Sequence, residues 1–228
     1  MNNTWKGSIV MEDHKRRPGR PMKQEAFGKE FLLANALNEF ARNGYDGTSL
    51  RTIAHLSDVD VSLITHHFGS KLDLWKAVVD DLAGKIMSRS PFIDYKRPAT
   101  RQELEAFARY VVDDFVDFNM SMPYHGMFIS NESMFANERS AYLMEKLVTP
   151  SCKLFLPFIE DCIREGLVQQ QEPVIFFLLL INSVSLFAAA PHHAGELLER
   201  VKPVDTLVSE LKRSVLAVFF KITEPAQK

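Results

Sequence analysis

Apolar residues recur at helical spacing along most of the chain, and the alternation that predicts strands is weak throughout. Leu33, Ala36, Leu37 and Phe40 lie on one face of a helix, which the sequence RNGYDG then ends. A second apolar stripe runs through a last helix, from Val204 to Phe219. The pattern therefore predicts an all-α fold.

Two short helices joined by a tight turn follow the first one. Thr48 or Ser49 can cap a helix over residues 50–56, and Asp60 can cap a helix over residues 61–68. Gly69 ends that helix, and Ser70 can cap a fourth, from about residue 71 to 88. This spacing is typical of a helix-turn-helix, in which one helix braces the next and the next is presented outward.

Beyond a linker with two prolines, Phe, Met and Leu dominate the chain. The pattern predicts five more helices, at roughly 100–121, 124–137, 139–166, 173–190 and 203–222, which makes about nine in all. We expect a disordered basic arm over 1–23, a helix-turn-helix domain over 24–71 and a ligand-binding and dimerisation domain over 72–228.

The bulk composition fits a globular, cytoplasmic protein, with 46% hydrophobic and 25% charged residues. The most apolar segment has 17 residues before Pro191 and is interrupted by Asn182 and two serines. A membrane span needs about 20 apolar residues, so this segment favours a helix buried in a core or between subunits. Cys152 and Cys162 would lie about 15 Å apart on one helix, too far for a disulfide.

Positive charge gathers near the N-terminus, although the net charge is -2. Residues 14–24 hold five Lys/Arg and no acid. Within them Arg17, Arg20 and Pro21 partly resemble an AT-hook, which inserts arginine into a narrow minor groove. A solubilising tail is the alternative interpretation.

His66 and His67 admit several interpretations. Neighbours on a helix point about 100° apart and do not easily hold one ion, and no cysteine or carboxylate at ligand spacing completes a metal site. No nucleophile elbow, Walker loop or dinucleotide turn is present. We therefore expect neither metal, cofactor nor enzyme activity. The histidines then lie on a plain surface helix, or on one that enters a major groove.

The segments ANALNEFARNGYDGTSLRTIA and ITHHFGSKLDLW carry a family resemblance. Through them residues 24–80 resemble the DNA-binding domain of the TetR family of bacterial transcriptional regulators. Two positions depart from the family pattern. Thr65 replaces a tyrosine that reaches phosphate, and Asp60 replaces a serine, so that a negative charge lies near the DNA.

The resemblance implies a role for each matching residue. Bases would be read at the start of the third helix, where apolar side chains can contact thymine methyls, and hydroxyl, imidazole and ammonium groups would contact phosphates. The predicted DNA contacts are Thr48, Ser49, Val61, Ser62, Leu63, Thr65, His66, His67 and Lys71, with Arg17 and Arg20 in the arm.

The resemblance also implies a homodimer, formed by the helices near 173–190 and 203–222, that binds a palindromic operator as a repressor and is released by a small-molecule effector. The alternative is a small-molecule-binding signalling protein whose helix-turn-helix contacts other proteins. Methionines and aromatics beside a few polar groups suit a cavity, though plain core packing is an alternative for each. The predicted pocket residues are Phe115, Phe118, Asn119, Met122, Met127, Phe128, Asn131 and Phe135.

Overall fold

The computed structural model describes residues 22–190, 193 and 203–222, with side chains from residue 28 onward. Every regular element in these residues is a helix, which confirms the all-α prediction. The predicted contacts Arg17 and Arg20 lie outside the described residues. The elements are α1 (Met22–Gly47), α2 (Leu50–Leu56), α3 (Val61–Phe68), α4 (Lys71–Arg89), α5 (Arg101–Ser121), α6 (Tyr124–Ser133), α7 (Glu138–Leu143), a π-helical turn (Met144–Val148), α8 (Thr149–Arg164), α9 (Pro173–Ala189) and α11 (Val204–Phe220).

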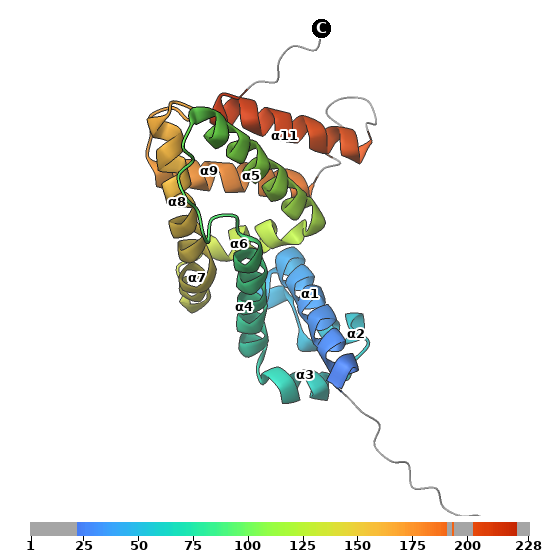
Figure 1. Ribbon diagram of the computed structural model, residues 1–228. Coiled ribbons are helices and arrows are strands. Elements are labelled where there is room, and N and C mark those ends of the chain that lie inside the picture. Colours follow the sequence, from blue (N-terminus) through green and yellow to red (C-terminus); the bar gives the residue numbers. More distant parts are fainter. Residues whose placement is uncertain (1–21, 191–192, 194–202, 223–228) are drawn as a thin grey trace, which may run out of the picture.

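The helices form two groups (Figure 1). Helices α1 to α4 gather at one end of the molecule, with α3 at its tip, and α5, α8, α9 and α11 gather at the other. Each group has a hydrophobic core, and the core around α1 to α4 also takes in buried residues of α6, α7 and the π-helical turn. Helix α6 packs against both α1 and α9, so it joins the two groups.

Local capping sets the limits of the short helices, as the sequence predicts. Ser49 caps α2, and the Asp60 carboxylate caps α3 by accepting a 2.7 Å hydrogen bond from the Ser62 backbone N–H. At the start of α4, Ser70 and Asp73 each accept from the other's backbone N–H, a reciprocal capping box. These bonds satisfy N–H groups that have no partner within the helix.

The later helices depart from the predicted ranges at two places. Helix α6 ends at Ser133 rather than near 137, because Asn137 caps the separate helix α7. The range predicted as one helix over 139–166 contains the π-helical turn, which ends just before Pro150. Proline has no N–H to donate to the preceding turn, so the regular hydrogen-bond pattern is interrupted there.

Helix α9 contains the most apolar segment of the sequence. One face packs into the core through Phe176, Leu180 and Val184, whereas Ile175 and Leu186 on another face are exposed, Leu186 to 73%. Burial of this helix is therefore one-sided within the chain. No helix of the described ranges combines the length and the apolar character needed to cross a bilayer.

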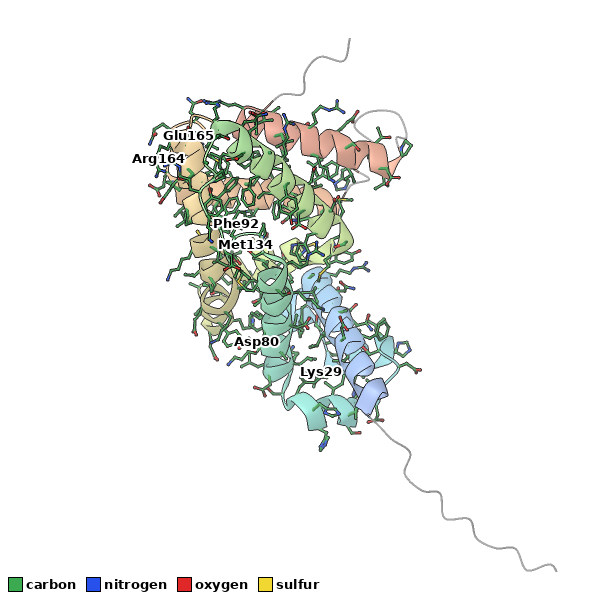
Figure 2. The ribbon with its side chains drawn as sticks, viewed as in Figure 1. Lys29, Asp80, Phe92, Met134, Arg164 and Glu165 are labelled. Atoms are coloured by element: carbon green, nitrogen blue, oxygen red, sulfur yellow. The ribbon has the colours of Figure 1, made fainter. Side chains whose placement is uncertain are left out.

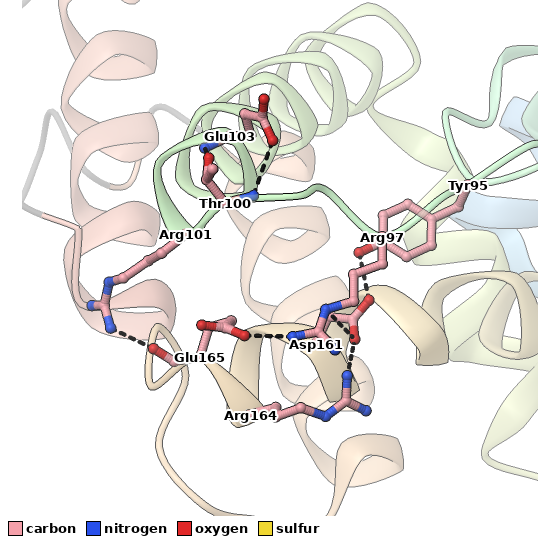
Figure 3. Close-up of polar contacts among 8 residues, drawn as sticks. All are labelled: Tyr95, Arg97, Thr100, Arg101, Glu103, Asp161, Arg164 and Glu165. Carbon is pink, nitrogen blue, oxygen red and sulfur yellow. Dashed lines mark hydrogen bonds and ion pairs between the residues drawn. The ribbon is translucent and has the colours of Figure 1, made fainter.

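The linker between α4 and α5 is held against α8 at a buried carboxylate (Figure 3). Asp161 is only 6% exposed and accepts a 2.9 Å hydrogen bond from the Tyr95 hydroxyl. Arg97 and Arg164 flank the same carboxylate. Burial and the bond to Asp161 raise the pKa of Tyr95 far above its ordinary value, so the hydroxyl stays a donor.

Replacing Asp161 with alanine is expected to loosen this linker. The Tyr95 hydroxyl and two guanidinium groups then lose an acceptor, which costs about 1–3 kcal/mol for a buried polar group left unpaired. Tyr95→Phe removes one neutral donor and should cost about 1 kcal/mol. Urea unfolding measures both. The matched control is Asp94→Ala, an exposed aspartate of the same linker, and equal stability of the Asp161 and Asp94 variants would contradict the assignment.

Candidate DNA interface and effector cavity

Helix α3 presents an exposed polar surface at the tip of the molecule (Figure 1). Ile64 is buried and fixes the inner face, and Val61 is half-buried. The His66 and His67 rings lie 5.4 Å apart in an edge-to-face arrangement. The exposed side chains are Ser62, Leu63, Thr65, His66 and His67, so five of the six residues predicted to contact DNA from this helix face solvent.

The two hydroxyls before α2 lie in different surroundings. Thr48 is 3% exposed, and its hydroxyl donates to the backbone carbonyls of Gly44 at 2.8 Å and Glu39 at 3.1 Å. Ser49 is exposed, and its Oγ lies 2.8 Å from that of Thr52. The hydroxyl of Thr48 therefore holds the turn together and lies outside the surface that a phosphate could reach, whereas Ser49 lies on that surface.

Lys71 is half-buried, and its ammonium forms hydrogen bonds within the helix-turn-helix. Its ammonium donates to the carbonyls of Tyr45 at 2.9 Å and Thr48 at 3.0 Å, and it lies 4.3 Å from the centre of the Tyr45 ring. A lysine has three N–H donors, so two of them are occupied within the protein. This internal role could not be predicted from the sequence, because the two carbonyls lie more than twenty residues earlier in the chain.

The two departures from the family pattern have local structural consequences. The Thr65 hydroxyl donates to the Ser62 carbonyl of its own helix at 3.0 Å, so it is directed along α3. Hydrogen bonds from the Ser62 hydroxyl and backbone N–H hold the pKa of Asp60 below its ordinary value. A carboxylate at the start of α3 is therefore charged wherever DNA binding is measured.

Two further exposed cations lie near this surface, and sequence reasoning did not assign them. Arg51 follows the cap of α2, and Lys29, near the start of α1, lies at the same end of the molecule as α3 (Figure 2). The Lys29 ammonium is 5.8 Å from the centre of the Phe68 ring of α3. Arg51 could have been assigned to this surface from the sequence, because it lies in the first turn after Ser49. Lys29 could not, because its distance from α3 depends on how α1 packs.

A cavity of about 180 Å³ lies in the other group of helices. The end of α4 and the linker after it form one wall, and α5, α6, α8 and α9 form the others. Most of the lining is apolar, and its aromatic members are Phe92, Phe115, Phe118, Phe155 and Phe177.

Of the predicted pocket residues, only Phe115 and Phe118 line this cavity. Asn119 is buried and accepts a 2.9 Å hydrogen bond from Ser185. Ser185 itself lines the cavity. The others are placed elsewhere because α6 turns its apolar side toward α1. Met122, Met127 and Phe128 pack into the core of α1 to α4, Asn131 donates to the Ala41 carbonyl of α1, and Phe135 is 60% exposed.

The polar groups of the lining are few and mostly paired. Arg89 and Asp114 form an ion pair with an N···O distance of 3.0 Å, and the Arg89 guanidinium lies 5.3 Å from the centre of the Phe118 ring. His125 is buried, and its Nδ1 contacts the Met122 carbonyl. Burial lowers the pKa of His125, against the opposing effect of that hydrogen bond, so the imidazole is neutral near pH 7.

Comparison with known proteins identifies the helix-turn-helix. Residues 32–78 match the family model of bacterial regulatory proteins of the tetR family, a family of transcriptional regulators rather than of enzymes. The chain is also 45% identical over 53 residues to the HTH-type transcriptional regulatory protein RaaS of Mycobacterium tuberculosis. That match spans 23% of this chain and about a quarter, 24%, of the length of the relative.

Solved structures of regulators share the fold over most of the chain. HlyIIR, a hemolysin II transcriptional regulator, is similar with a TM-score of 0.61 and 16% identity, over 86% of this chain and 98% of that one. A member of the TetR transcriptional regulator family from Streptomyces coelicolor is similar with a TM-score of 0.59 and 20% identity, over 85% and 91%. At these identities the likeness concerns the fold.

Removing the charge of Asp60 is expected to tighten DNA binding. In Asp60→Ser a hydroxyl keeps the cap of α3, and the repulsion between a carboxylate and phosphate is lost. The gain should be about fivefold at most, as for exposed charges, and should shrink with added salt. Fluorescence anisotropy with labelled duplex DNA measures it. Asp94→Ser, which removes an equal charge far from α3, is the control, and an equal gain in both variants would contradict the prediction.

Acidification is expected to destabilise the fold around His125. Because burial lowers its pKa from the ordinary 6.5, the unfolded chain takes up a proton before the folded one does, and the free energy of unfolding falls as pH drops below that value. Thermal unfolding across this range should show a steeper loss for the native chain than for His125→Gln. Parallel curves would show that His125 titrates alike in both states.

Proposed function

By its helix-turn-helix domain this chain belongs to the TetR family of bacterial regulatory proteins, and we propose that it acts as a homodimeric repressor. The dimer binds a palindromic operator through α3 and releases it when a small molecule enters the cavity. The observation that carries the proposal is the exposed polar surface of α3 at the tip of the molecule, opposite α9 and α11.

The chemistry of this surface supports a division of roles. Ser62 and Leu63 lie at the start of α3, where side chains can reach base edges, and Leu63 is 43% exposed. An aliphatic side chain offers no donor, so Leu63 contacts a thymine methyl group. Ser49, His66 and His67 contact phosphates, as does the remaining N–H of Lys71.

An unpaired apolar surface supports dimerisation through α9 and α11. The exposed residues include Ile175, Leu178, Leu179 and Leu186 of α9 and Val218 of α11, the last exposed to 75%. Exposed apolar side chains on two neighbouring helices are typical of an interaction site, and two helices from each protomer can form a four-helix bundle. Two-fold symmetry of the dimer then matches a palindromic operator.

The position of α4 supports release by an effector. Its last turn and the residues after it line the cavity through Ile86, Met87 and Phe92, and its first turn follows α3 directly. A ligand that binds one position of α4 more tightly than another changes the separation of the two α3 helices. The coupling requires this difference in affinity between two states.

Selection of binding sites from random duplex DNA with the purified protein tests the proposal. We expect an inverted repeat, with affinity that falls steeply with salt because phosphate contacts release counterions. His67→Ala should weaken binding, because a contact to phosphate is lost. Lys153→Ala, which removes an exposed cation of α8 far from α3, is the control.

Failure of the selection has a defined meaning. If no sequence is enriched and affinity does not depend on salt, the helix-turn-helix does not bind DNA, and the proposal is wrong. The surface of α3 would then contact another protein, as in a small-molecule-binding signalling protein. Enrichment of a single half-site without a repeat would leave DNA binding intact but contradict the dimer.

A further inference from the structure

The volume of the cavity suits a ligand with a single ring. A drug-sized ligand needs roughly 300 Å³ or more, whereas this cavity has about 180 Å³. A cavity of about 150 Å³ with an apolar lining binds benzene. The rings of Phe92, Phe115, Phe155 and Phe177 in the lining offer edges and faces to another aromatic ring, an arrangement worth more than area burial alone.

The charges of the lining favour an uncharged ligand. Arg89 and Asp114 are the charged residues of the lining, and they are paired with each other at 3.0 Å. An anionic ligand would have to displace Asp114 from Arg89, and a cationic one would have to displace Arg89 from Asp114. A charged ligand would also lose its water on entering a mostly apolar lining whose two charges are already paired with each other, and such a loss is costly.

One hydrogen-bond acceptor of the lining has no partner in the described part of the chain. A carbonyl only accepts, so the contact between Nδ1 of His125 and the Met122 carbonyl requires a proton on Nδ1. In the neutral imidazole Nε2 then carries a lone pair. No donor from the described residues forms a hydrogen bond with Nε2. Nε2 is also not one of the fully buried side-chain atoms that lack a partner, so its surface is accessible. Since His125 lines the cavity, a ligand donor can reach this nitrogen.

We propose that the cavity binds a simple phenol, an uncharged monocyclic aromatic molecule whose hydroxyl donates to Nε2 of His125. The proposal rests on the proposed function in that it names the chemical class of the effector. A phenol is neutral at pH 7, since its pKa lies near that of tyrosine, about 10. It combines the three properties that the lining selects: one ring, no charge and one donor.

Fluorine NMR of three small probes with the free protein tests the proposal. The probes are para-fluorophenol, para-fluorotoluene and para-fluorobenzoate, which share the ring and differ in one substituent. We expect para-fluorophenol to bind about three- to tenfold more tightly than para-fluorotoluene, the factor of one hydrogen bond. Para-fluorobenzoate should bind most weakly. Equal affinity of the phenol and toluene probes, tightest binding of the benzoate, or no binding of any probe would each overturn the proposal.

Two variants locate the interaction. His125→Leu removes the acceptor, so it should weaken the phenol probe by the same factor and leave the toluene probe unchanged, whereas the control His55→Leu, on the exposed face of α2, should change neither. Ile181→Phe enlarges a half-buried lining residue and should abolish binding of all probes. If His125→Leu does not fold, the ranking of the probes and Ile181→Phe still decide. Undiminished phenol binding in either folded variant contradicts the proposed site.

A second titration separates this proposal from effector release. Para-fluorophenol is added to the complex of the protein with its selected DNA. Binding to the free protein without loss of DNA would support the ligand class and contradict release by an effector. Release of DNA by para-fluorophenol supports both.

Discussion

The corner at Gly69, Ser70 and Lys71 fixes α3 against the rest of the molecule. Gly69 has φ 87°, a conformation that L side chains rarely adopt, and a Cβ there would lie 3.1 Å from a carboxylate oxygen of Asp73. Ser70 and Asp73 then start α4 with a capping box, and Lys71 ties this start to the carbonyls of Tyr45, in the last turn of α1, and Thr48, just before α2. Three elements therefore meet within three residues, and a displacement of α4 is passed directly to α3.

From this corner α4 runs to the cavity, and a second connection runs through α6. Trp75 is fully buried in the core of α1 to α4, so α4 moves with that core. Asn131 of α6 donates to the Ala41 carbonyl of α1 at 2.8 Å. At the other side of α6, a Cβ at Gly126 would lie 2.3 Å from the Cβ of Ser185 in α9, so the backbone of α6 packs directly against Ser185. Close-packed helices of this kind transmit a shift instead of absorbing it. On the proposed function, a ligand between α4, α6 and α9 therefore acts on both connections to α3.

The sequence predicts the parts of this structure that depend on neighbours in the chain. The limits of α2 and α3 follow from Ser49, Asp60 and Gly69, since a cap satisfies backbone groups within one turn. The cavity depends instead on which face α6 turns toward α1, a choice made by packing between distant segments. Phe128 thus belongs to the core of α1 to α4, although the composition of the segment around it suits a pocket equally well. The internal role of Thr48 has a local cause: its hydroxyl reaches the carbonyls of Glu39 and Gly44 because the backbone leaves the helical conformation at Gly44.

On the proposed function, affinity and specificity for DNA come from different elements. Residues 61–68 contain no lysine or arginine, so the charge that attracts phosphate must lie mainly outside α3. Lys29 and Arg51 are exposed near it on α1 and α2, and their contacts carry no base information. Within α3, the hydroxyl of Thr65 is turned to its own helix, which leaves base reading to Ser62 and Leu63. A helix with one small donor and one aliphatic side chain discriminates through few contacts, and neither side chain can form the bidentate pairs that separate bases most strongly. Selectivity then requires that the two α3 helices of the dimer bind two half-sites together. An effector therefore needs to change only the spacing between these helices to release the DNA.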